Sequence, residues 1–228
     1  MRFFFSTVWA VAEKDLRLEL RERESLAVMV VFTLLVLTLF SFAFGPGQGG
    51  KEAAPLQAGV LWVAFLFASV TGFSRSMGIE RESHGFSAMR LSPADPAAIY
   101  FGKMGAIVFL VAVMETAGFA ALAVFYRAPV WENLGPLALV ALVATLGISA
   151  IGTLFAAMTA QTKTRDILLP VLMFPLLAPV LIGAVKATAA ILAGGGWEET
   201  GDWVKLIGAY DLIFISVAAV MFEYVLEE

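Results

Sequence analysis

The sequence predicts an all-α membrane protein in which six transmembrane helices follow an amphipathic helix. Of the 228 residues, 60% are hydrophobic and 15% are charged, and the mean hydropathy is +0.87. Soluble proteins are about a quarter charged, so the surplus of apolar residues is expected to face lipid. Six apolar stretches are long enough, at about 1.5 Å per helical residue, to cross a hydrocarbon core of about 30 Å. Lysine and arginine residues are concentrated in alternate connections between these stretches.

Residues 1–24 are predicted to form an amphipathic helix that lies in the membrane interface. Apolar residues recur at i, i+3, i+4 and i+7 spacing, and this face comprises Phe5, Val8, Trp9, Ala12, Leu16 and Leu20. The other side carries Lys14, Arg17, Arg21 and Glu24. A secretory signal peptide is the alternative, because residues 10–12 resemble a cleavage site. The interfacial helix is favoured because its apolar face continues past that point and a membrane span follows directly.

Residues 25–228 are predicted to form a single membrane domain with six spans. The spans are placed at Ser25–Phe44, Gln57–Met77, Tyr100–Tyr126, Leu134–Met158, Ile167–Ala193 and Val204–Val225. If the N-terminus is cytoplasmic, the lysine and arginine residues on the outer side are only Lys51, Arg127, Lys186 and Lys205, of 15 in the chain. This bias predicts that both termini are cytoplasmic.

The polar connection at residues 78–99 is predicted to be a cytoplasmic coupling loop on which a soluble motor protein docks. Phe86 and Met89 stand at i, i+3 spacing within a charged rim, which suits the docking of a partner. The candidate docking residues are Glu80, Arg81, Glu82, His84, Phe86, Met89 and Arg90, with Lys163 and Arg165 of the next cytoplasmic loop as a second contact. The alternative is a solvated connection without a partner.

Enzymatic chemistry is not expected from this chain. A Walker A motif requires Gly-Lys followed by Ser or Thr, but Gly50-Lys51 precedes Glu52 and Gly102-Lys103 precedes Met104. The chain has no cysteine and one histidine, His84, and a lone histidine makes a poor metal site. No basic stripe suited to nucleic acid is present. Any ATP that drives this protein is therefore expected on another chain.

Three charged residues are predicted to lie within the membrane, where each is a functional candidate because burying a charge in lipid is costly. Glu115 lies near the midplane of the third span. Its carboxyl group either faces a substrate path or is satisfied by a neighbouring helix. Lys186 and Asp211 lie at matching depths in the fifth and sixth spans, and they are expected to form an ion pair.

The fifth span contains Pro170, Pro175 and Pro179, which predict a kinked helix because proline removes a backbone donor and clashes with the preceding turn. A kinked span suits a protein that changes shape, and a static bend is the alternative.

The fourth span carries small residues at i+4 spacing, which predict a close packing seam within the subunit or between two copies. These residues are Ala141, Thr145, Ser149, Thr153 and Ala157.

Several stretches taken together resemble one family, the haem exporter protein B family, CcmB. They are residues 14–23, 80–103, 147–154, 168–182 and 222–227, of which the arginine-rich first stretch and the triple-proline run are the most specific. The resemblance implies an ABC-2-type permease of the bacterial inner membrane that acts as a homodimer in cytochrome c maturation. It also implies a CcmA-like ATPase that binds the ATP, CcmC-like and CcmD-like haem-handling membrane subunits, and a CcmE-like periplasmic haem chaperone.

Two functional hypotheses follow from the resemblance. The chain either conducts haem as a substrate, or transmits force that releases the haem-loaded chaperone; no cofactor is expected to belong to the chain itself. A haem-sized cavity reaching Glu115 would favour conduction, and a packed dimer seam along the fourth span would favour force transmission. Further alternatives are an ABC permease for another lipid or drug, and an ion-coupled secondary transporter that uses Glu115 as a proton carrier.

Overall fold

The computed structural model describes residues 2–45, 50–82, 85, 89, 91–160, 162 and 164–227, and the described residues form helices and connecting turns without strands. The helices are α1 (Arg2–Glu22), α2 (Glu24–Phe44), α3 (Ala54–Glu82), α5 (Pro96–Tyr126), α6 (Leu134–Thr159), α7 (Arg165–Leu192) and α8 (Trp197–Glu227). Two short 3-10 helices, η1 (Lys51–Ala53) and η2 (Trp131–Asn133), precede α3 and α6. Six of these segments are long and apolar enough to cross a membrane, which confirms the predicted fold class.

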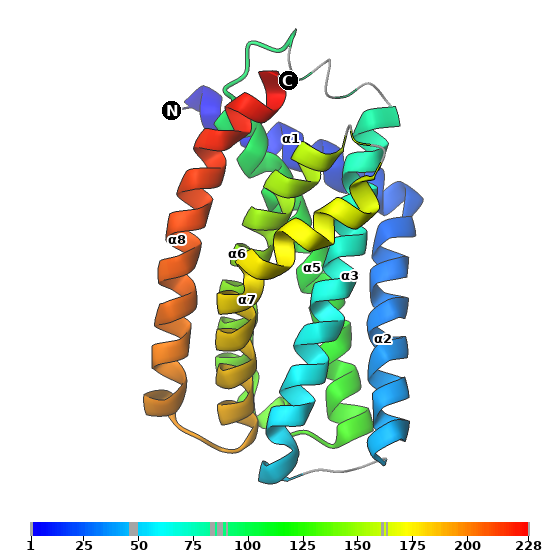
Figure 1. Cartoon of the computed structure of the whole chain (residues 1–228), viewed down its shortest axis with the longest axis vertical. Coiled ribbons are helices and arrows are strands. Elements are labelled where there is room, and N and C mark those ends of the chain that lie inside the picture. The colour runs from blue at the N-terminus through cyan, green and yellow to red at the C-terminus, as the bar shows by residue number, and fades with distance from the viewer. Residues whose placement is uncertain are drawn as a thin grey trace.

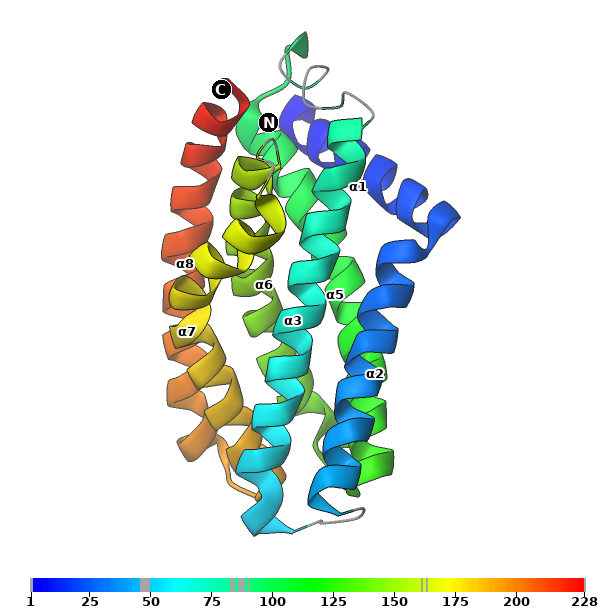
Figure 2. The same ribbon diagram turned by 45° about the vertical axis from the view of Figure 1, so that its right-hand side comes forward.

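The six long helices run side by side and place both termini at the same end of the molecule (Figure 1). We call this end the terminal face, and the other end the opposite face. Helix α1 lies across the terminal face rather than along the bundle, as a second view also shows (Figure 2). The connections from α2 to α3, from α5 to α6 and from α7 to α8 lie at the opposite face (Figure 1).

A left-handed residue and a carboxylate cap separate α1 from α2. Arg23 has φ 56° and ψ 8°, a conformation that ordinary residues rarely adopt and that stops a helix. The side chain of Glu19 accepts a hydrogen bond of 2.8 Å from the backbone N–H of Leu26, near the start of α2. Since the first N–H groups of a helix have no partner within it, this bond stabilises the turn that directs α1 over the terminal face.

Two of the spans begin earlier than predicted because polar residues open their helices. Helix α5 begins at Pro96 rather than Tyr100, since the carboxylate of Asp95 accepts a hydrogen bond of 2.9 Å from the N–H of Ala97 and caps the helix. Helix α8 begins at Trp197, and its first turn carries Glu198 and Glu199, which favour a helix N-terminus. Hydrophobicity alone underestimates such polar first turns.

Buried aromatic side chains join the helices through their polar ends. The indole N–H of Trp62 in α3 donates to the hydroxyl of Thr188 in α7 over 2.9 Å. The hydroxyl of Tyr100 in α5 donates to the carbonyl of Ala150 in α6 over 3.1 Å. Large aromatic groups bury much apolar surface, and these hydrogen bonds satisfy their polar atoms. The bonds thereby fix α3 against α7 and α5 against α6.

The small residues of the fourth span pack within the subunit. All five of them are buried in α6: Ala141, Thr145, Ser149, Thr153 and Ala157. Gly152, next to this stripe, lies against the ring of Phe73 in α3, and a Cβ at that position would overlap the ring. The seam is therefore occupied by neighbouring helices of the same chain and is closed to a second copy.

Helix α7 changes direction along its length. The part that follows Arg165 crosses the front of the bundle, whereas the later part runs along the other helices (Figure 1). Pro170, Pro175 and Pro179 all lie inside α7, and a proline in a helix interior kinks it. The hydroxyl of Tyr210 in α8 donates to the carbonyl of Leu176, next to Pro175, so a neighbouring helix supports the backbone beside this proline.

Candidate functional site

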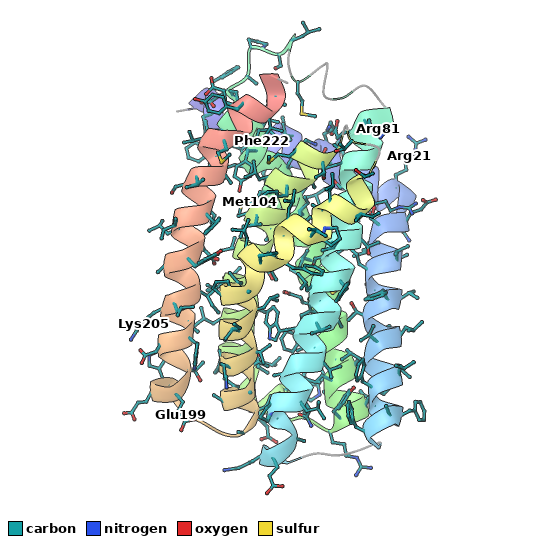
Figure 3. All side chains as sticks on the ribbon, in the orientation of Figure 1. Arg21, Arg81, Met104, Glu199, Lys205 and Phe222 are labelled. Carbon is teal, nitrogen blue, oxygen red and sulfur yellow. The ribbon has the colours of Figure 1, made fainter. Side chains whose placement is uncertain are left out.

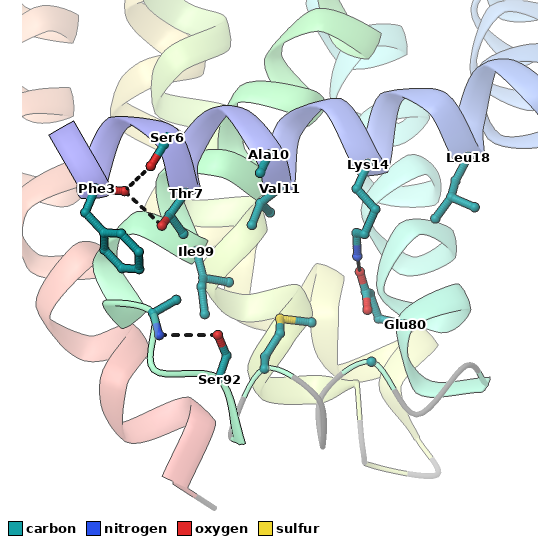
Figure 4. A pocket seen from close by; sticks show the side chains of 13 residues that line it. Phe3, Ser6, Thr7, Ala10, Val11, Lys14, Leu18, Glu80, Ser92 and Ile99 are labelled. Atoms are coloured by element: carbon teal, nitrogen blue, oxygen red, sulfur yellow. Dashed lines mark hydrogen bonds and ion pairs between the residues drawn. The ribbon is translucent and has the colours of Figure 1, made fainter.

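Three helices meet at the terminal face in a network of four charged side chains. The ammonium group of Lys103 in α5 donates to Glu80 of α3 over 2.7 Å and to Asp15 of α1 over 3.2 Å. Lys14 of α1 also donates to Glu80 (Figure 4) and lies 3.0 Å from Asp15. The side chain of Lys103 is only 1% exposed. Two ammonium groups and two carboxylates balance in this network, which lowers the cost of burying the charge of Lys103.

Gly102 allows α1 to lie directly on α5 beside this network. A Cβ at Gly102 would stand 2.7 Å from the Cβ of Val11 and 2.8 Å from the carbonyl oxygen of Val8. Both distances are shorter than van der Waals contact, so only glycine fits here without a shift of α1. The close crossing brings Asp15, one helical turn after Val11, within reach of Lys103.

The network also shifts the pKa values of two of its members, Glu80 and Lys14, both of which lie outside the membrane-spanning segments. Burial raises the pKa of the Glu80 carboxyl, but the ammonium groups of Lys103 and Lys14 outweigh burial and hold the pKa below its usual range. Burial lowers the pKa of Lys14, and the carboxylates of Asp15 and Glu80 outweigh it, so the net pKa is raised. Each group thus favours its charged form.

Glu80 stands two residues before the end of α3, which continues through Glu82, so the first five residues of the predicted coupling loop at 78–99 are helical instead. The next residue, Arg81, donates to the carbonyl of Ala160 over 3.5 Å. Ala160 follows α6 and opens the second loop of the terminal face. The end of α3 therefore contacts α1 and α5 through Glu80 and contacts the second loop through Arg81.

A groove of about 770 Å³ lies under α1 next to this network. Its lining combines Phe3, Val11 and Lys14 of α1 with Glu80 (Figure 4). The half-buried Met89 also lines it. The predicted docking residues His84, Phe86, Arg90 and Lys163 lie outside the described residues. The backbones of Glu82 and Arg165 are described at the end of α3 and the start of α7, but their side chains are not.

Glu115 lies inside the bundle and is 3% exposed. The hydroxyl of Thr145 in α6 lies 2.7 Å from both oxygens of its carboxyl group. Glu115 and Thr145 also line a groove of about 470 Å³ between α5 and α6, which extends to Trp131 near the opposite face. The two alternatives predicted for Glu115 thus coexist: a neighbouring helix contacts the carboxyl, and a cavity reaches it.

The expected ion pair between Lys186 and Asp211 is wrong. Asp211 is 4% exposed, and neither of its carboxyl oxygens has a hydrogen-bond partner among the described residues. Its carboxyl group lies against Gly147 of α6, where a Cβ would overlap it. The side chain of Lys186 is exposed on α7. The two residues lie at similar depths in the predicted membrane spans. Each helix is rotated about its own axis, however, so that the two side chains face different neighbours.

Four charged side chains mark the two ends of the molecule. Arg21 and Arg81 lie toward the terminal face, whereas Glu199 and Lys205 lie toward the opposite face (Figure 3). The sequence analysis assigned no structural role to Lys103 and did not predict its contact with Asp15. One signal was available, because Lys103 lies inside the apolar stretch predicted to begin at Tyr100, where a charge requires partners.

These features define the class of protein. Six helices that are long and apolar enough to cross a membrane, with a seventh helix across one end (Figure 1), are typical of a polytopic membrane protein. A family model described as CcmB protein matches residues 6–227, and the chain belongs to the CcmB family. This membership confirms the predicted resemblance. No curated protein matches the chain.

The family supplies the permease component of the haem-exporting ABC system in cytochrome c maturation. Membership agrees with a non-catalytic chain, since a permease component need not bind nucleotide itself. Together with the six apolar helices, it identifies a multi-pass protein of the inner membrane.

Proposed function

We propose that this chain transmits force from a CcmA-like ATPase to the haem-handling partners of cytochrome c maturation, and so promotes release of the haem-loaded chaperone. The observation that supports the proposal is the network of Lys103, Glu80 and Asp15. It joins three helices at the point where α3 leads into the loop at 83–90. With the terminal face in the cytoplasm, this is where a soluble motor has access.

The network suits force transmission because it resists separation. Removing one partner from a buried ion pair leaves an uncompensated charge, which costs about 3–5 kcal/mol. When the ATPase displaces the loop, Glu80 moves with the end of α3, and Lys103 and Lys14 carry α5 and α1 along. The bend in α7 gives a further helix that can change shape between the two faces.

The assembly in this proposal contains two copies of the chain and two ATPase subunits. The ATPases bind the loops near Phe86 and Arg165 on the cytoplasmic side. CcmC-like and CcmD-like membrane subunits handle haem, and a CcmE-like chaperone receives it outside. The chain itself holds no cofactor in this scheme, and ATP is bound only by the motor.

Haem conduction is the second candidate. The groove that reaches Glu115 favours it, and the buried seam along α6 does not supply the dimer contact that was expected to favour force transmission. Among the described residues, the groove is lined by side chains between Val108 and Thr145, in α5, α6 and the connection between them. None of the charged residues of the network at the terminal face is among them. The described lining therefore does not extend to the terminal face, which favours the role of a mechanical link over that of a conduit.

The test is co-purification of the chain with its ATPase from detergent, followed by ATP hydrolysis and haem absorbance on the same sample. Phe86→Ala combined with Met89→Ala should release the ATPase, because these side chains form the docking surface in the proposal. Lys103→Met, compared with the wild type at equal amounts of folded protein because the change is also expected to destabilise the chain, should retain the ATPase but lose chaperone release. Glu13→Gln, which removes an exposed pair with Arg17 on the same helix, is the control and should behave as the wild type.

The outcomes separate the hypotheses. ATPase activity that depends on this chain, with haem only on a partner subunit, supports the mechanical link. Haem held by this chain alone would instead support conduction. Absence of any association with the ATPase would overturn the proposal and favour an ion-coupled secondary transporter, which would be active in proteoliposomes without a motor.

A further inference from the structure

The groove between α5 and α6 places an acidic group at the bottom of an apolar cavity. Its volume of about 470 Å³ falls within the range of about 300–1,000 Å³ that is typical of small-molecule sites. Most of the lining side chains are apolar, and the small residues Ala112 and Ala141 provide its width. The polar side-chain atoms of the lining residues come from Glu115, Thr145 and Thr116 and from the indole N–H of Trp131.

We propose that this groove binds a lipophilic cation, an organic ammonium or phosphonium group with apolar substituents, and that Glu115 is its counter-charge. The ligand would enter from the lipid, place its apolar substituents along the alanine walls and bring its positive centre to the Glu115 carboxylate. This inference does not rest on coupling to an ATPase, because it concerns the binding of a ligand by this chain alone.

Charge complementarity favours a cation over a neutral ligand. Glu115 is nearly completely buried, and the neutral hydroxyl of Thr145 donates to its carboxyl group. Among the described residues that line the groove, none is a lysine or an arginine. A positive partner stabilises a carboxylate buried in a membrane, and a bound cation would supply one among described groove residues that include no lysine or arginine.

The aromatic residues of the groove suit the same ligand. Phe119 stands one helical turn from Glu115 on α5, and Trp131 lines the end of the groove near the opposite face. The ring of Phe119 packs edge-on against Phe65, with centroids 5.6 Å apart, which fixes its orientation. A cation is attracted to the face of an aromatic ring, most strongly where water is excluded. Neither an acyl chain nor a proton would need this combination of width, aromatic rings and acid.

The experiment measures binding of tetraphenylphosphonium to the purified full-length chain in lipid nanodiscs, with empty nanodiscs as the blank. We expect saturable binding with one site per chain. Glu115→Gln, which keeps an acceptor for Thr145, should weaken binding at least tenfold. Phe119→Leu should weaken it by about fivefold through loss of the aromatic face.

Asp211→Asn is the matched control, since Asp211 is also a buried carboxyl group but lies outside this groove. The affinity of this variant for tetraphenylphosphonium should equal that of the wild type.

Triphenylphosphine oxide, a neutral probe of similar shape, distinguishes charge recognition from simple apolar filling. We expect its binding to be weak and independent of Glu115. Equal affinity of the wild type and the Glu115→Gln variant for tetraphenylphosphonium would overturn the proposal, as would equal binding of the neutral probe. If Glu115→Gln does not give a monodisperse protein, the Phe119→Leu variant and the neutral probe still decide the question.

Discussion

The ammonium group of Lys103 lies 2.7 Å from the carboxylate of Glu80, and both side chains are almost fully buried at the boundary between the bundle and α1. They come from different helices, so the ion pair fixes the end of α3 against α5. Asp15, 3.2 Å from the same ammonium group, adds α1 to this arrangement. A charge that is buried and shared by three helices is sensitive to small displacements, because its partners cannot be replaced by water.

Replacing Lys103 by methionine should destabilise the fold strongly. The change leaves Glu80 buried with only part of its compensation, and we expect a loss of about 3–5 kcal/mol in the free energy of unfolding. Titration with a denaturing detergent, followed by circular dichroism, measures the change. The double variant Lys103→Met with Glu80→Gln should lose less than the sum of the two single changes. Strictly additive losses would show that the two side chains do not interact.

The stability of the chain should depend on pH through Glu80. Its pKa is lower in the folded chain than the value of about 4.3 expected when unfolded. The stabilisation is therefore present in full above the unfolded pKa and is lost as pH falls through the folded pKa. Wild type and Glu80→Gln should differ in unfolding temperature at pH 6 to 7, and the difference should shrink below about pH 4. A difference that stays constant down to pH 3 would contradict this assignment.

The topology could be predicted from the sequence because lipid imposes simple requirements. A span needs about 20 apolar residues, and the first predicted span, Ser25–Phe44, matches α2 to within one residue at its start. The three prolines likewise identify α7 as an irregular helix. The prediction of neighbouring side chains failed for Lys186 and Asp211. Whether two side chains meet depends on how each helix is rotated about its own axis, and similar depth in the membrane does not determine that rotation.

The charged network escaped prediction for a related reason. Lys103 and Asp15 are separated by 88 positions in the chain, and no local pattern connects them. Their contact depends on Gly102, whose missing side chain lets α1 approach α5. Docking through His84, Phe86 and Arg90 remains a prediction, because these residues lie outside the described part of the chain.

Replacing Gly102 by alanine should displace α1 from α5. The new methyl group would meet the side chain of Val11 and the carbonyl oxygen of Val8, and such overpacking costs about 1–3 kcal/mol. Gly105→Ala is the matched control in the same helix, because no atom lies within 4 Å of a Cβ there. Limited proteolysis at α1 should accelerate in the first variant alone. Equal protection of both variants would refute the close crossing.

Replacing Gly147 by alanine should disturb the contact between α6 and α8. Its Cβ would overlap the carboxyl group of Asp211, which is buried and has no room to move away without cost. We expect a loss of about 1–3 kcal/mol in the free energy of unfolding. Adding Asp211→Ala to this variant should restore stability, since it removes the overlapping atoms. Gly135→Ala, at an open position of α6, serves as the control and should be neutral.

The distribution of positive charge predicts that the terminal face is cytoplasmic, and cysteine labelling can test this. The chain contains no cysteine, so each introduced thiol reports alone. Leu91 precedes α5 at the terminal face and is 87% exposed, and Glu199 lies at the opposite face (Figure 3). A membrane-impermeant maleimide should label Glu199→Cys in intact spheroplasts and Leu91→Cys only in inverted vesicles. The reverse pattern would invert the topology and remove the proposed docking surface from reach of any ATPase.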